Sequence, residues 1–188
     1  MGQDDQFSIA DMNVGVARSI HWWPEQSGIG GAYDEFTEIP DPDHLFIVPH
    51  GGTLSFLLQF PNEASNPSIL FQDSLGPIDA DDSSGEDYQS NLERLLASEE
   101  GVNLWLTCVD CADTKEEFQP YLDIIQPQTV FAIHFDGLSP DIEQGLQESF
   151  QEPSWYRQSL MESGAEGVDP DEYFDRFELI DGRLQKRQ

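Results

Sequence analysis

The sequence has very little positive charge. Only 8 of its 188 residues are lysine or arginine, against 37 aspartates and glutamates, and the formal net charge is −29. Such a surface repels the phosphates of nucleic acids and anionic lipid headgroups, so we expect neither as a partner. The acids are spread along the whole chain, and their mutual repulsion is screened at about 1 M salt, where the Debye length is about 3 Å. The composition therefore favours a halophilic protein, with an ordinary acidic protein as the alternative.

Long apolar runs are also missing. The sequence contains no stretch of about 18 apolar residues and no basic leader followed by an apolar segment. We therefore expect a cytoplasmic chain with no membrane span and no signal peptide. Its length is enough for one domain with a substantial core.

Cysteine is scarce, and the two cysteines form one pair, Cys108 and Cys111. A structural zinc site would need a second pair of ligands, and a thioredoxin-like redox pair would need a helix N-terminus. The residues directly before Cys108 are instead typical of a strand. We therefore expect two thiols, buried or at the rim, at the end of that strand.

Hydrophobic periodicity and turn residues predict an α/β domain over residues 14–150. We expect a flexible N-terminus over residues 1–13 and an acidic, aromatic extension over 151–188 that wraps the body. The predicted strands cover residues 14–21, 51–60, 68–74 and 102–107, with a further strand that ends at His134, and the predicted helices cover 88–100, 115–125 and 140–150.

Three of the predicted strands end on a residue type that binds metals, namely His21, Asp73 and His134. Imidazole and carboxylate groups are common zinc ligands, and the C-terminal ends of strands border the ligand crevice in layered α/β folds. These residues are our candidate metal ligands, with His50 as an alternative to His21. A histidine that only caps its strand with a hydrogen bond is the other interpretation of His134. His44 is expected to be a solvated loop residue.

The order of these pieces, over residues 14–138, resembles the C-terminal half of the metallo-β-lactamase fold, especially its lactonase-like and phospholipase-D-like branches. Residues 19–21 look like the strand with that family's third histidine ligand, and residues 51–58 resemble its glycine-led strand. Residues 69–74 are similar to the strand that ends in the metal-bridging aspartate, and 122–136 to the helix and strand that bring the last histidine. The resemblance implies half of an αββα sandwich: a mixed sheet with helices on one face.

The sequence departs from that family in lacking its HxHxDH signature, since its only histidines are residues 21, 44, 50 and 134. The resemblance implies a hydrolase of esters, lactones or phosphodiesters that uses zinc or another divalent metal. Without the signature, such an enzyme would be truncated or split, and its catalytic residues are unknown. The alternative is an inactive half-domain, acting as a binding or assembly module or surviving as a gene remnant.

A half-sandwich on its own would expose a large apolar sheet face, which monomers rarely tolerate. The residues expected on that face are aromatic: Trp22, Trp23, Phe46, Phe56 and Phe71. We therefore expect a homodimer, a missing N-terminal half as partner, or coverage of the face by the C-terminal extension.

Overall fold

The fold is that of a computed structural model, which describes residues 6–19, 53–63, 66–72, 75, 78–79, 88–108, 112, 114–133, 155–168, 175–180 and 182–187. Within these ranges the chain forms a seven-stranded sheet, a separate two-stranded hairpin and three helices. In chain order the elements are β1 (Gln6–Ile9), β2 (Met12–Ser19), β3 (Thr53–Gln59), β4 (Ser68–Gln72), α1 (Tyr88–Leu95), β5 (Leu104–Cys108), α2 (Lys115–Ile125), β6 (Thr129–Ile133), α4 (Tyr156–Ser163), β7 (Glu166–Val168), β8 (Arg176–Ile180) and β9 (Arg183–Arg187).

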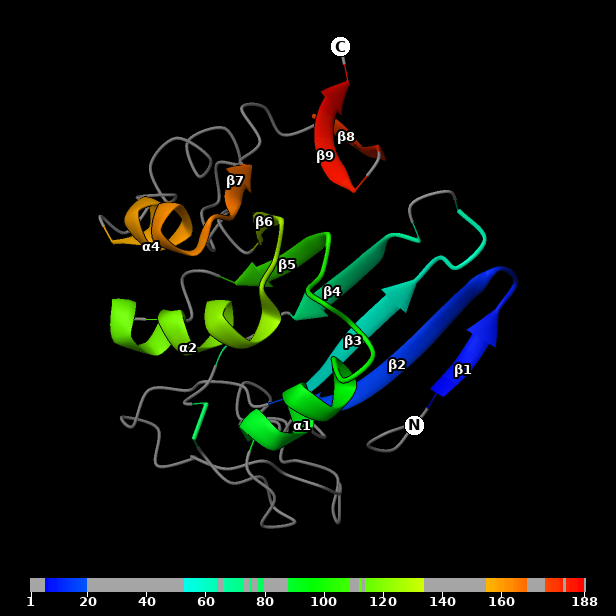
Figure 1. The fold of residues 1–188 in the computed structure, drawn as a ribbon, viewed down its shortest axis with the longest axis horizontal. Coiled ribbons are helices and arrows are strands. Elements are labelled where there is room, and N and C mark those ends of the chain that lie inside the picture. The colour runs from blue at the N-terminus through cyan, green and yellow to red at the C-terminus, as the bar shows by residue number, and fades with distance from the viewer. Residues whose placement is uncertain are drawn as a thin grey trace, which may run out of the picture.

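The large sheet is mixed, and its strands lie side by side in sequence order from β1 to β7. Strands β1 to β4 pair antiparallel; the connections β1–β2 and β3–β4 are short, whereas residues 20–52 separate β2 from β3. Strands β4 to β7 pair parallel, and the connections through α1, α2 and α4 fit the helical crossovers that parallel strands need. The predicted α/β class is confirmed (Figure 1).

One face of the sheet packs against all three helices in a single core. Trp105 of β5 is fully buried, and its ring stacks on Phe118 of α2 at 5.4 Å between centroids. Phe118 in turn contacts Tyr156 of α4 edge-on at 5.8 Å. Leu92 of α1 and Leu57 of β3 belong to the same cluster of buried side chains. The helices therefore cover one face, as the sequence predicted.

Helix α2 follows directly from local signals in the sequence. The Thr114 side chain accepts a hydrogen bond from the backbone N–H of Glu117, and acidic residues occupy the first turn, where the helix dipole favours them. The helix ends at Gln126, which adopts a left-handed conformation and bonds back to Leu122.

The second face of the sheet is also apolar, because side chains alternate between the two faces along each strand. One row across the sheet, read from the strand register, consists of Val16, Phe56, Phe71, Leu106, Phe131 and Val168. The next row consists of Phe7, Val14, Leu58, Ile69, Leu104 and Thr129, whose side chains, like those of the first row, are buried or half-buried. This row ends at Glu166 of β7, which is exposed. Strands that are apolar on both faces are typical of sheets that are covered on both sides.

Part of this second face is covered by the chain's own C-terminal hairpin. Phe177 of β8 contacts Phe131 of β6 at 5.2 Å with an interplanar angle of 75°. The hairpin turn at Gly182 lies against the side chains of Asn103 and Gln128, next to the starts of β5 and β6. Figure 1 shows the hairpin beside the C-terminus, away from the helices.

The ends of the chain differ most from the sequence analysis. Residues 6–9 and 12–13, assigned there to the flexible N-terminus, form β1 and the start of β2. The C-terminal extension supplies α4 and the hairpin, and it adds β7 to the large sheet. The helix predicted over 140–150 lies outside the described residues.

None of the helices in the described part of the chain has the length and apolar character needed to cross a membrane.

Candidate functional site

Strands β2, β4, β5 and β6 all end at the same edge of the large sheet. Strands β4, β5 and β6 are parallel, so their C-terminal ends lie together. Strand β2 is antiparallel to β3, which is antiparallel to β4, so β2 also runs in the direction of β4. We call this side the C-terminal edge, and the opposite side, where these four strands begin, the N-terminal edge.

The chain reaches the C-terminal edge just before each predicted metal ligand. Strand β2 ends at Ser19, two residues before His21. Strand β4 ends at Gln72, directly before Asp73, and β6 ends at Ile133, directly before His134.

The candidate ligands themselves, His21, Asp73, His134 and the alternative His50, all lie outside the described residues. Within the described ranges, no group of three or more His, Cys, Asp or Glu residues is placed to hold a metal ion. What the structure contributes is therefore the position of the strands that precede these residues.

The spacing of these strands suits ligands that share one ion. Neighbouring strands lie about 4.8 Å apart, so β4 and β6, which flank β5, are separated by about 10 Å. An aspartate and a histidine side chain, each with a bond of about 2 Å to a zinc ion, can together span such a distance. The same separation holds between β2 and β4, which flank β3.

A buried hydrogen-bond network fixes the end of β4. The Gln72 amide nitrogen donates to the Tyr88 hydroxyl of α1, and its amide oxygen accepts from the Trp105 indole N–H at 3.1 Å. The Ser55 hydroxyl of β3 lies 3.4 Å from the Tyr88 hydroxyl. All four side chains are buried. The network holds the residue directly before Asp73 against two strands and a helix.

Cys108 lies at the C-terminal edge between β4 and β6, and it corrects one of our predictions. Its side chain is buried, at the strand end where the sequence placed it, but it is disulfide-bonded. The expectation of two thiols was therefore wrong, since the structure has no free cysteine among the described residues and the sequence has one other cysteine, Cys111. Sequence spacing alone does not distinguish a thiol pair from a disulfide in a CxxC segment.

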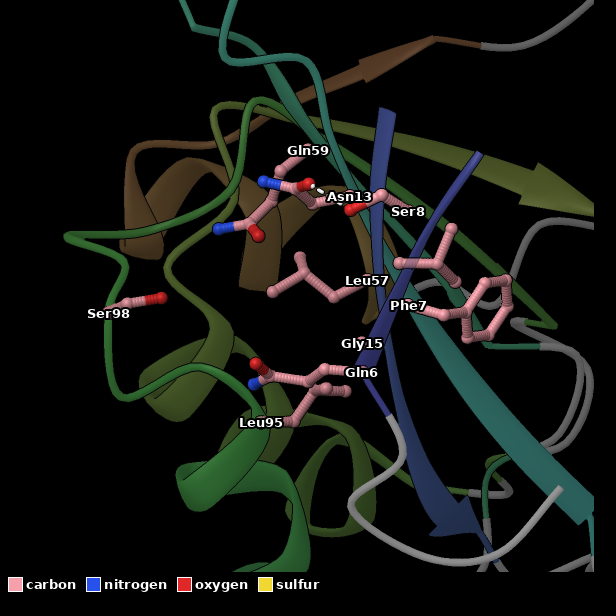
Figure 2. Close-up of a pocket in the computed structure, with 10 residues that line it drawn as sticks. Gln6, Phe7, Ser8, Asn13, Gly15, Leu57, Gln59, Leu95 and Ser98 are labelled. Atoms are coloured by element: carbon pink, nitrogen blue, oxygen red, sulfur yellow. Dashed lines mark hydrogen bonds between the residues drawn. The ribbon is translucent and has the colours of Figure 1, made fainter. Parts of the chain in front are cut away.

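The described part of the chain also has a hollow near the N-terminal edge, where β2 begins and β3 ends. It has a volume of about 240 Å³, with Leu57 and Leu95 side chains at its base (Figure 2). Its polar lining is uncharged and comes from residues Gln6, Ser8, Asn13, Gln59 and Ser98. The Ser8 hydroxyl donates to Asn13, and the Gln59 amide donates to Glu99. This hollow lies at the edge of the sheet opposite to the C-terminal ends of β2, β4 and β6.

No protein-family model matches this chain, and no curated protein matches it.

Sequence reasoning missed the roles of Gln72, Tyr88 and Cys108. Gln72 and Tyr88 were assigned only to a strand and a helix, and nothing in their local sequence indicates that they bond to each other.

Proposed function

We propose that this chain forms one half of a metal-dependent hydrolase of the metallo-β-lactamase type. The observation that supports the proposal is that β2, β4 and β6 end at a common edge. Strand β2 ends two residues before His21, β4 ends directly before Asp73, and β6 ends directly before His134. Three residues of types that bind zinc follow, in chain order, three strands that run in one direction.

In this proposal each residue has a separate role. His21 would hold one metal ion and His134 a second, Asp73 would be a ligand shared by both, and His50 is the alternative to His21. When bound, zinc or another divalent ion lowers the pKa of its water to about 7 and polarises a scissile ester, lactone or phosphodiester. The Gln72 network restricts the backbone that leads into Asp73, which favours a fixed ligand position.

The second half of the site would come from another sheet. Three ligands distributed over two metal positions leave each position short of the usual four. The half-buried members of the second face, such as Phe56, Phe71 and Leu106, support the αββα half-sandwich, because a second sheet packed there would bury them further, whereas Val14, Val16 and Leu104 are already buried. Among the described residues, the C-terminal hairpin contacts this face at Phe131.

Zinc titration of the chain by calorimetry tests the site. We expect weak binding that is abolished by His134→Ala and strongly reduced by Asp73→Asn, because each change removes one ligand. His44→Ala is the matched control and should leave binding unchanged. If His134→Ala binds zinc as well as the unmodified chain, surface carboxylates hold the ion and the site proposal fails.

An inactive assembly module is the second candidate function, and the apolar second face favours it. In this case the chain would bind a partner sheet without metal or catalysis. Adding a polypeptide that carries the HxHxDH half separates the candidates: hydrolysis of an ester or phosphodiester that depends on His134 supports the enzyme, whereas complex formation without turnover supports the module.

A further inference from the structure

The scarce positive charge of this protein is concentrated in the C-terminal hairpin. Four of the eight basic residues lie within β8 and β9, namely Arg176, Arg183, Lys186 and Arg187. The rest of the chain is therefore even more acidic than the whole.

The hairpin has two different faces, which its register defines. Phe177 pairs with Lys186 and Leu179 with Leu184, and this inner face packs on the large sheet through Phe177 and Phe131. The outer face carries the pairs Arg176–Arg187, Glu178–Gln185 and Ile180–Arg183. The three outer arginines are exposed.

The outer face carries three arginines but only one carboxylate, that of Glu178. Arg187 pairs with Glu178, with Nε 2.7 Å from Oε2. Arg176 and Arg183 form no ion pair with any carboxylate in the described part of the chain. Arg176 also lies directly opposite Arg187, an arrangement of like charges that destabilises a hairpin. An anionic partner would remove this cost.

An acidic groove lies at the N-terminal edge of the sheet, which the hairpin turn also reaches. It has a volume of about 520 Å³ and lies between the C-terminal ends of α1 and α2. Its acidic lining residues are Glu93, Glu99, Glu100 and Asp123. Helix C-termini carry partial negative charge, which adds to the attraction for cations.

The groove and the hairpin flank one short stretch of this edge. The groove is lined by Gly101 and Gln126, each two residues before Asn103 and Gln128, on which the hairpin turn rests. The groove lies on the helix-covered face and the hairpin on the second face, and both reach this edge; a twofold axis at the edge would place the hairpin of each copy against the groove of the other.

We propose that the outer face of β8–β9 binds a second copy of this chain, with its arginines against the acidic groove of that copy. Guanidinium and carboxylate groups form bidentate, charge-assisted hydrogen bonds, so this chemistry fits both surfaces. A nucleic acid is a poorer occupant, because a long polyanion on the hairpin would also meet the acidic remainder of the chain. The contact is at the edge opposite to the candidate metal ligands, so it is independent of the proposed function.

In this dimer, added salt should strengthen the association of the two copies rather than weaken it. Two chains of charge −29 repel each other over long distances at low ionic strength. At about 1 M salt the Debye length is about 3 Å, so this long-range repulsion is screened far more than ion pairs at direct contact. Dimerisation should therefore strengthen from low salt to molar KCl, whereas an ordinary ion-pair interface weakens.

Sedimentation velocity of the full chain across this salt range tests the inference. We expect a dimer in molar KCl, and a dissociation constant raised by about tenfold or more in the double variant Arg176→Gln/Arg183→Gln. Lys115→Gln/Arg157→Gln is the matched control: it removes the same charge from α2 and α4 and should dimerise normally. Circular dichroism verifies that each variant is folded.

A charge-exchange experiment identifies the two surfaces. Arg176→Glu/Arg183→Glu and Glu99→Arg/Glu100→Arg should each be monomeric alone, and an equimolar mixture should form a heterodimer. A chain that is monomeric at every salt concentration, a dimer that the hairpin variants do not weaken, or a mixture without heterodimer would each overturn the proposal. Binding of a labelled oligonucleotide by a monomeric chain would identify the other occupant instead.

Discussion

The network around Gln72 gives the sharpest prediction for stability. Replacing Tyr88 with Phe keeps the ring in the core but removes the hydroxyl that accepts the hydrogen bond from the Gln72 amide. Gln72, Tyr88 and Trp105 are each at most 1% exposed, so water cannot easily replace the lost partner. A buried donor left without an acceptor costs about 1–3 kcal/mol.

This cost is large compared with the stability of a typical domain, about 5–15 kcal/mol. For a chain of this length each kcal/mol lowers the melting temperature by about 2–4 °C, so Tyr88→Phe should lower it by about 2–12 °C. Urea unfolding in molar KCl should show a lower midpoint with an unchanged m-value, because the change does not alter the surface exposed on unfolding.

Ser55→Ala is the matched control for this prediction. The Ser55 hydroxyl lies 3.4 Å from the same tyrosine oxygen, a longer and weaker contact than the bond from Gln72. Its removal should therefore cost less than Tyr88→Phe. If Tyr88→Phe is as stable as the unmodified chain, or costs less than Ser55→Ala, the network does not hold the end of β4.

Three further predictions concern charge and backbone geometry. If the dispersed acids are an adaptation to salt, the melting temperature should rise steadily from low salt to molar KCl, and a flat or falling curve in a thermal scan would contradict the halophilic interpretation. Gly101→Ala should destabilise more than Gly164→Ala in urea unfolding: both glycines have positive φ, but an added Cβ at Gly101 would lie 2.6 Å from the Gln126 carbonyl oxygen, whereas the space at Gly164 is open. The hydrogen bond from Lys115, with a further one from Gln158, lowers the pKa of the exposed Glu162 carboxyl, so Lys115→Gln should raise that pKa in an NMR titration, and no change would contradict the pairing. A lowered pKa adds stability above the ordinary pKa that is lost as the pH falls, so the same variant should show a slightly weaker loss of stability in acid.

The residues of the proposed metal site were predicted from the sequence, and the structure adds the arrangement of the strands that lead to them. The sequence predicts His21, Asp73 and His134 at the ends of three strands, and the structure shows that β2, β4 and β6 run in one direction and end at one edge, directly or two residues before them. The position of Cys108 at a strand end was also predicted, but its disulfide was not.

The sequence by itself determined the elements whose signals are local. Hydrophobic periodicity and turn residues predicted β2, β3 and β4, and the apolar face of residues 115–125 with the turn at Pro127 predicted α2, because these signals act over a few residues. A further local signal is the Asp–Gly dipeptide at 181–182, a sequence pattern typical of two-residue hairpin turns, which precedes β9, although the acidic composition around it obscured the strands.

Only the tertiary structure decided which distant residues meet. Three contacts join positions that are distant in the chain: the pairing of the edge strand β7 with β6, the hydrogen bond between Gln72 and Tyr88, and the contact of Phe177 with Phe131. Such contacts depend on strand order and on how buried surfaces fit together, which local periodicity does not encode. The same reason explains the arginine hairpin and the acidic groove: both compositions are visible in the sequence, but their position at one edge follows from the folded sheet.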